Sequence, residues 1–335
     1  MPTLKDVAQL ADVSTATVSH VLNGKKKVSP EVVERVQRAV SAIGYRVNSA
    51  ARALRTGRTG ILGLIVPDIT NPFFPQLAQA VEARAKSAGY ATVLLESGYQ
   101  VETEAQGLDF LARHQVDGLI WVLSGGPPRH AQPDFPTVVV DYAPPDWNAV
   151  HADDYGGGRL QARFAVEAGH RRVALLWGPL TVTSIQERRR GFLEEAGPNL
   201  EIVHECSAPF GLTLPRMTER ELLRQQGRFS LLVCGNDMLA VAALRALKRA
   251  GIDVPGQVSV IGFDDTALAE IVEPPLTTIA QPVRKLGSLA VEQLLRLISG
   301  AQQAPRQQVV PVTLKERGST RRLTLQATPT SAEVA

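Results

Sequence analysis

Acidic, amide and guanidinium side chains accompany apolar runs in the second half of the chain. Asp264 directly follows the run 258–263, and Asn236 follows the run 231–235. Arg188 lies on a stretch with helical periodicity. A carboxylate accepts hydrogen bonds and a guanidinium donates them in a fixed fork, so Asp264 and Arg188 together are complementary to vicinal hydroxyls or to the edge of a purine. These residue types indicate a binding site for a small polar molecule.

An aromatic side chain ends another apolar run, 118–123. Trp121, Leu123 and Ser124 lie at the end of this run, and we expect one of them to touch the ligand. The flat face of Trp121 would suit the C–H surface of a sugar. Packing of Trp121 in the core is an alternative that the residues leave open.

Signatures of catalysis and of resident metals are missing from the sequence. The six histidines have no HExxH spacing, and no GxSxG motif occurs. Asp264 and Asp265 have no third ligand at metal spacing, so we expect Asp265, like Asp237, to cap the helix that follows it. The glycine triplet 156–158 lacks a following Gly-Lys-Ser/Thr and is expected at a helix start. We therefore expect no enzyme, no cofactor and no metal site.

Length and composition indicate a folded protein of more than one unit. The chain has 335 residues, of which 44% are hydrophobic, which is ample for burial and too long for one small core. No apolar run approaches the ~20 residues that cross a bilayer. Lys5 and Asp6 interrupt the N-terminus where a signal peptide would be apolar. Cys206 and Cys234 cannot form a disulfide framework, so we expect a cytoplasmic protein with buried thiols.

Residues 61 to about 328 alternate between β-branched runs and amphipathic stretches. This alternation predicts parallel strands with helices on both faces, in two similar α/β units of about 100 residues each. Ligands of such sheets bind beyond the carboxyl ends of the strands.

The first sixty residues have a different pattern and a different charge. They carry ten basic and four acidic residues, a net charge of +6, in a chain whose total is +3. Helices are expected over 4–10, 15–22 and 30–43, with Ser14 as the N-cap of the second, which is helix-turn-helix geometry. The second helix has small or polar outward residues that suit a DNA groove, namely Thr15, Ala16, Thr17, Ser19 and His20. A generic three-helix bundle remains the alternative from this pattern alone.

Two segments resemble the opening of LacI/GalR (lactose/galactose repressor) family transcription regulators. They are LKDVAQLADVSTATVSHVLNG and GYRVNSAARALRTGRTGILGLIVPDITNPFF, and the similarity extends over essentially the whole chain. The resemblance implies an all-α helix-turn-helix head, a hinge helix, and an α/β core of two lobes with parallel sheets, similar to periplasmic binding proteins. The implied bounds are 1–46 for the head, 47–60 for hinge and linker, 61–328 for the core and 329–335 for a disordered tail. Within the core, the N-lobe would be 61–168 with 283–311, and the C-lobe 169–282 with 312–328.

The resemblance also implies DNA contacts. Thr15, Ala16 and His20 would read base edges, although the family more often has Arg at the position of His20. Contacts to phosphates are implied for Ser14, Thr17, Ser19 and Asn23. In the hinge, Asn48, Ala51 and Leu54 would lie in the minor groove, where Leu54 wedges between base pairs. Asp12 stands where Gly is usual, but Asp tolerates the left-handed conformation, so the turn should survive.

For the cleft between the lobes, the resemblance implies effector contacts at Asn71, Phe73, Phe74 and Arg188, which match family positions, and an aromatic wall at Phe210. The full set of expected effector contacts is Asn71, Phe73, Phe74, Trp121, Ser184, Arg188, Phe210, Asn236 and Asp264. Asp153 matches a further position near the cleft.

The sequence thus predicts a homodimeric repressor of a pseudo-palindromic operator, controlled by a small molecule, with no membrane partner. A sugar or sugar derivative is the expected effector. A purine or nucleoside is the alternative, and a sugar-binding receptor without a DNA role is a remote one. The tail has no leucine heptad, so no tail-mediated tetramer is expected.

Overall fold

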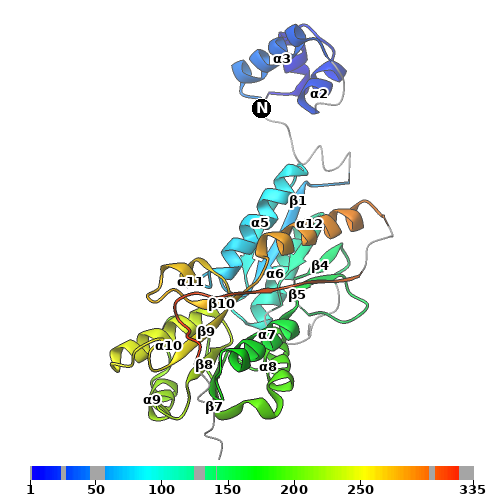
Figure 1. Ribbon diagram of the computed structural model, residues 1–335. Helices are drawn as coiled ribbons and strands as arrows, with labels where there is room; N and C mark the ends of the chain where they lie inside the picture. Colours follow the sequence, from blue (N-terminus) through cyan, green and yellow to red (C-terminus); the bar gives the residue numbers. More distant parts are fainter. Residues whose placement is uncertain are drawn as a thin grey trace, which may run out of the picture. The chain divides into compact units, whose positions relative to one another are not determined.

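The protein forms two compact units, residues 1–59 and 60–335, in a computed structural model (Figure 1). The structure describes residues 2–23, 28–45, 57–123, 133–140, 142–301 and 306–323. Several predicted features lie outside these described residues: the hinge positions Asn48, Ala51 and Leu54, the strand-end residue Ser124, the side chain of Asn23, and the tail. Each unit is described by itself.

The first unit contains three helices, α1 (Leu4–Leu10), α2 (Thr15–Asn23) and α3 (Pro30–Ile43). Their buried sides meet in a small core centred on Val7, Val18 and Val36, each fully buried. α3 begins with a proline in its first turn and ends at Gly44, which has the left-handed φ of 61°. The three expected helices are therefore confirmed.

A six-stranded, all-parallel sheet forms the first lobe of the second unit, in the order β11-β5-β4-β3-β1-β2. Its strands are β1 (Ile61–Val66), β2 (Ala91–Glu96), β3 (Gly118–Trp121), β4 (Thr137–Val139), β5 (Ala149–Ala152) and β11 (Gln307–Val310). Three helices cover it: α5 (Phe73–Ser87), α6 (Val101–Arg113) and α12 (Val283–Ile298). Successive β1 residues face opposite sides, because Leu64 joins the core under α5 and α12 while Ile65 joins the core with Leu111 of α6.

The second lobe contains another six-stranded sheet, in the order β12-β10-β9-β8-β6-β7. Its strands are β6 (Arg172–Trp177), β7 (Glu201–Ser207), β8 (Leu231–Cys234), β9 (Ser259–Asp264), β10 (Thr277–Ala280) and β12 (Thr313–Lys315). Only β12 runs antiparallel, against β10. Its helical elements are α7 (Asp154–Glu167), α8 (Thr183–Ala196), the 3-10 turn η1 (Gly197–Asn199), α9 (Arg216–Arg224), α10 (Asp237–Arg249) and α11 (Ala267–Ile271). Its cores lie under α7 and α8 on one face and under α9 and α10 on the other.

The chain passes between the two sheets at three places: after β5, after β10 and after β11. The prediction that the first lobe extends to residue 168 is wrong, because α7 packs on α8 and its Phe164 joins the core of the second lobe. The third passage lies between the end of β11 at Val310 and the start of β12 at Thr313.

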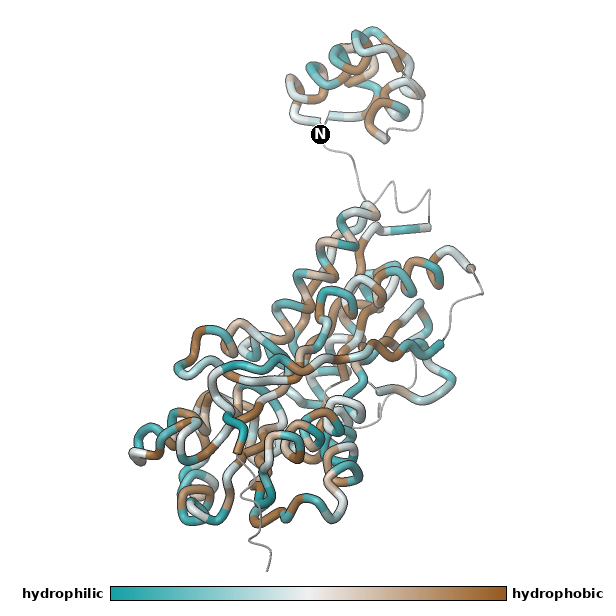
Figure 2. The backbone as a smooth tube through the Cα atoms, in the orientation of Figure 1, coloured by the Kyte–Doolittle hydropathy of each residue, from teal (hydrophilic) through white to brown (hydrophobic). Residues whose placement is uncertain are grey.

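Hydrophobic and hydrophilic residues alternate along the helices of the core, as amphipathic covering helices require (Figure 2). Among the described residues, no helix is both long enough and apolar enough to cross a membrane.

Candidate effector-binding cleft and DNA-binding head

Helix α2 presents the small and polar side chains that the sequence assigned to DNA contact. Thr15 and Ala16 are exposed, and His20 is half-buried. Val18 faces inward and is fully buried, so the helix is anchored by one face and presents the other. The Ser14 Oγ accepts a hydrogen bond from the Thr17 backbone N–H at 3.0 Å and lies 2.8 Å from the Thr17 hydroxyl. Ser14 therefore caps α2, as expected.

The turn before α2 survives the replacement of the usual glycine. Asp12 has a φ of 50°, which confirms the expected left-handed conformation. Arg35 of α3 donates to the carbonyl oxygen of Ala11 from Nε at 3.0 Å and from Nη2 at 2.7 Å, and Nη2 also donates to the Asp12 carbonyl at 2.7 Å. The sequence reasoning missed Arg35, which ties the turn to α3 through two otherwise unused carbonyls.

A cavity that is partly open to solvent lies between the two lobes of the second unit. Eight of the nine expected effector contacts line it: Asn71, Phe73, Phe74, Ser184, Arg188, Phe210, Asn236 and Asp264. Trp121 does not. It is fully buried among core residues, packs near Trp147, and donates from Nε1 to Glu104 at 2.8 Å. The side chain of Trp121 faces the α6 side of the sheet, which is the core alternative. Leu123, from the same expected group of three, does line the cavity.

Arg188 is the centre of the polar end of the cavity. Its Nε donates to Asp154 Oδ1 at 2.7 Å, and its Nη1 donates to the Gly235 carbonyl at 2.7 Å and lies 3.3 Å from Asp264 Oδ1. The guanidinium carbon lies 3.7 Å from the centroid of the Phe263 ring, in cation–π contact. Arg188 is only 6% exposed, so these contacts fix its fork in place.

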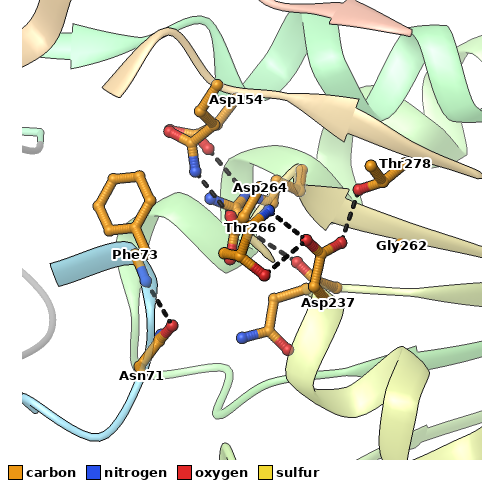
Figure 3. Close-up of polar contacts among 12 residues, drawn as sticks. Asn71, Phe73, Asp154, Asp237, Gly262, Asp264, Thr266 and Thr278 are labelled. Atoms are coloured by element: carbon orange, nitrogen blue, oxygen red, sulfur yellow. Dashed lines mark hydrogen bonds and ion pairs between the residues drawn. The ribbon is translucent and has the colours of Figure 1, made fainter. Parts of the chain in front are cut away.

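Two buried carboxylates, those of Asp154 and Asp264, contact this guanidinium. Asp237 is a third buried carboxylate, next to Asp264 (Figure 3). Burial is the main cause that raises the pKa of Asp154, and it raises the pKa of Asp264 to about 6 against the lowering effect of Arg188. Behind Asp264, burial and the charge of Asp264 raise the pKa of Asp237 to about 8. The polar end of the cleft therefore carries more negative than positive charge when ionised.

Asp237 does not cap its helix, contrary to the expectation. It accepts hydrogen bonds from the backbone N–H and the hydroxyl of Thr266, at 2.7 and 3.1 Å, and from the Thr278 hydroxyl at 2.6 Å. Asn236 caps α10 instead, accepting from the Leu239 N–H at 3.0 Å. Asp237 thus links β8, β10 and the turn that carries Asp264.

Two other acidic residues that the sequence singled out have partners outside the cavity. Asp153 accepts from the Gly156 N–H at 2.8 Å and caps α7, so it lies beside the cleft without lining it. Asp265 pairs with Arg317 at 2.7 Å and makes no cap. The glycine triplet does lie at the start of α7, as expected.

The apolar walls come from both lobes. Phe73 and Phe74 are in edge contact, with centroids 5.3 Å apart, at the start of α5. Tyr99 of the first lobe and Phe210 of the second lie with centroids 5.8 Å apart. Aromatic side chains thus face the cavity from either side.

Sequence reasoning missed four lining residues that carry polar side-chain groups, Tyr99, His151, Asp154 and Gln281. Gln281 lies on the second crossover and donates from Nε2 to Asp264 Oδ1 at 2.7 Å. Asp154 directly follows Asp153 in the sequence. The prediction that Asp153 lies near the cleft could therefore have pointed to Asp154. Within the described ranges, no group of three or more His, Cys, Asp or Glu residues could hold a metal ion.

Comparison with known proteins agrees with this geometry. Residues 3–48 match the model of bacterial regulatory proteins of the lacI family, and residues 162–320 match the periplasmic binding protein-like domain. The ribose operon repressor of Escherichia coli K12 is 36% identical over 330 residues, covering 95% of this chain and 100% of that protein. The chain belongs to the LacI family of transcriptional regulators.

Other LacI-family members extend the comparison. The HTH-type transcriptional repressor PurR of Vibrio vulnificus is 34% identical over 310 residues, covering 89% of this chain and 92% of that protein. A lac repressor dimer bound to operator has a TM-score of 0.84 at 28% identity, covering 96% and 99% of the two chains. A regulator from Alkaliphilus metalliredigens complexed with D-xylulofuranose has a TM-score of 0.72 at 30% identity, covering 78% and 99%. The chain is therefore a DNA-binding repressor of this family with an effector-binding core, and the family is not one of enzymes.

Proposed function

We propose that the protein acts in the cytoplasm as a homodimeric repressor whose affinity for a pseudo-palindromic operator changes when an uncharged, ribose-sized sugar binds in the cleft. The observation that carries this proposal is the buried Asp154–Arg188–Asp264 cluster at the end of an aromatic-walled cavity.

This cluster suits a polyol. The carboxylate of Asp264 accepts from hydroxyls, while the amides of Asn71 and Asn236 supply donors, because the oxygen of each already accepts a backbone N–H, that of Phe73 and that of Leu239. The rings of Phe73 and Phe210 supply apolar surface for the C–H face of a furanose or pyranose. The ribose repressor and the regulator complexed with D-xylulofuranose support a pentose as the first candidate.

Charge favours a neutral sugar over a sugar phosphate. Among the described lining residues, Arg188 is the one guanidinium or ammonium group, and it already contacts Asp154 and Asp264. A phosphate placed beside two buried carboxylates would meet repulsion in a low-dielectric site.

A purine effector is the second candidate. The PurR relatives support it, and two facing aromatic walls can stack on a flat base. The polar groups of Asp264 and Asn236 could bond its edge. The test below includes this ligand.

In the head, we assign base contacts to Thr15, Ala16 and His20 of α2. Thr17, Ser19 and Asn23 are assigned to the phosphates, which fix register without reading sequence. The hinge residues Asn48, Ala51 and Leu54 are assigned to the minor groove. Effector binding and operator binding are then linked equilibria, with a typical coupling of about 1–3 kcal/mol.

The experiment is a gel-shift titration of the purified protein on its own promoter fragment. D-ribose, ribose 5-phosphate, hypoxanthine and guanine are added in turn. A shift in operator affinity with D-ribose alone supports the proposal. A response to a purine alone selects the second candidate, and a response to ribose 5-phosphate contradicts the charge argument. Failure to retard any promoter fragment, with or without ligand, contradicts the DNA-binding role.

A further inference from the structure

The turn that presents Asp264 is strained. Asp264 has a φ of 119° and Asp265 a φ of 58°, so two consecutive residues with side chains occupy backbone conformations that favour glycine. Such conformations persist only when surrounding contacts hold them, and they concentrate at functional sites. The contacts that hold this turn are therefore part of the site.

One side of the turn is held from within the cleft. Asp264 Oδ1 accepts from Gln281 Nε2 at 2.7 Å and lies 3.3 Å from Arg188 Nη1. The backbone N–H of Thr266, two residues after Asp264, donates to Asp237 at 2.7 Å. These groups line or adjoin the cavity, so an incoming ligand would compete with some of them.

The other side is held from outside the cleft, by the segment that follows the third crossover. Arg317 comes shortly after β12, and its Nη2 lies 2.7 Å from Asp265 Oδ1. Its Nη1 donates to the Leu276 carbonyl at 3.0 Å, and its backbone N–H donates to the Thr277 hydroxyl at 2.9 Å. The guanidinium is therefore fixed to the start of β10 and is placed to hold Asp265.

This ion pair is better shielded than an ordinary surface pair. The side chains of Arg317 and Asp265 are 17% and 21% exposed. Glu270 lies 3.3 Å from the same nitrogen but is 74% exposed, so it is a weaker partner. Arg317 does not line the cavity.

We propose that Arg317 is a positioning residue for effector binding: its ion pair with Asp265 holds the strained turn in the conformation that directs Asp264 into the cleft. The proposal rests on the proposed role of Asp264 in binding the effector. It adds that the affinity of the cleft depends on a residue that the effector does not touch.

The test compares Arg317→Gln with Arg322→Gln. Arg322 pairs with Glu316 at 3.0 Å in the same segment, but both side chains are about half exposed and neither holds the turn, so it is the matched control. By calorimetry with D-ribose, we expect Arg317→Gln to raise the Kd about tenfold or more, as loss of a shielded charge pair does, and Arg322→Gln to stay within about twofold. Operator binding without sugar should be unchanged in both, which also reports that the variants fold. If Arg317→Gln does not fold, Asp265→Asn, which tolerates the positive φ and lacks the charge, takes its place.

A rescue variant separates positioning from general stability. Adding Asp265→Gly to Arg317→Gln removes the strain at that position, so we expect the Kd to return to within about threefold of wild type. A residue that only stabilises the lobe would not be rescued there, because glycine adds no contact. An unchanged Kd in Arg317→Gln, or failure of the glycine to rescue, overturns the proposal.

Hydrogen exchange tests the same inference without any sugar. The amide of Thr266 should exchange about tenfold faster in Arg317→Gln than in wild type or Arg322→Gln, because its turn opens more often. Unaltered exchange overturns the proposal. If wild type does not bind D-ribose, the effector assignment fails, and exchange still decides the role of Arg317.

Discussion

The head and the cleft present their functional side chains in opposite ways. On α2, Thr15 and Ala16 are exposed, and the helix alone sets where they point. In the cleft, Arg188 and Asp264 are nearly fully buried and are fixed by partners from distant parts of the chain. The functional surface of the head is therefore formed by a single helix, whereas the cleft depends on contacts between residues that are distant in the sequence.

The difference predicts different consequences of mutation. An exposed residue on α2 can change without leaving a buried partner unsatisfied, so its substitution should alter recognition and leave stability nearly unchanged. A residue of the cleft network leaves other charges unpaired when it is removed, so binding and stability change together.

The largest effect is expected for Asp264→Ala. The change removes the proposed hydroxyl acceptor and leaves Gln281 and Arg188 with fewer partners, so we expect the affinity for D-ribose to fall by roughly 100-fold, about 3 kcal/mol. Calorimetry measures it, and gel shifts should show operator binding that no longer responds to sugar. Asp68→Ala is the control, since Asp68 accepts a hydrogen bond from the Thr70 backbone N–H in a neighbouring loop and does not line the cavity. A variant that still responds would remove Asp264 from the site.

One buried histidine of the second unit should make the stability of the protein depend on pH. His170 is fully buried, with Nδ1 2.8 Å from the Ser230 hydroxyl, and burial lowers its pKa to about 4. The unfolded chain, with a His pKa of about 6.5, binds this proton more readily. The folding free energy from this group is therefore fully present above about pH 6.5 and is lost as pH falls towards 4, by about 2 kcal/mol at pH 5.

Thermal unfolding between pH 4 and 7 measures this effect. His170→Gln should flatten the acid slope, and His114→Gln, at an exposed position, should leave it as in wild type. The acidic cluster acts with the opposite sign: the raised pKa values of Asp237 and Asp264 make stability fall as pH rises through their range. If the stability of His170→Gln falls with decreasing pH as steeply as that of wild type, other groups cause the acid sensitivity.

A smaller effect is expected for His20→Arg on α2. Arginine can bond guanine through two donors where a neutral imidazole offers one, so the preference at one base pair of each half-site should shift by about tenfold. Selection from randomised operators measures the shift. Gln37→Arg on exposed α3 adds the same charge and should strengthen binding to all sequences without a new preference. If both variants select the same operator sequences, His20 does not contact a base edge.

The same contrast explains how much the sequence predicted. Local patterns placed the three head helices and the cap at Ser14, because a cap and a helix face depend on neighbours within a few residues. Polar residues after strands located most of the cleft for a similar reason, since parallel strands end at one edge.

What the sequence did not predict depends on contacts between distant residues. Trp121 and Asn236 both lie at the ends of apolar runs, but the alternation of strand faces turns Trp121 into the core. Asp237 and Asp265 look like helix caps, and only the fold brings Thr266, Thr278 and Arg317 to them. The first crossover was misplaced because α7 begins with glycines and has a weak apolar pattern.

The smallest expected effect concerns the cap of α2. Ser14→Ala removes the bond to the Thr17 N–H and should destabilise the head by about 1 kcal/mol. Chemical unfolding followed on the head, together with gel shifts, should show reduced stability and a modest loss of operator affinity, with no change in the affinity for sugar. Ser41→Ala, at an exposed position of α3 with no capping role, is the control. A loss of sugar affinity in Ser14→Ala would contradict the separation drawn between a surface set by one helix and a network set by the fold.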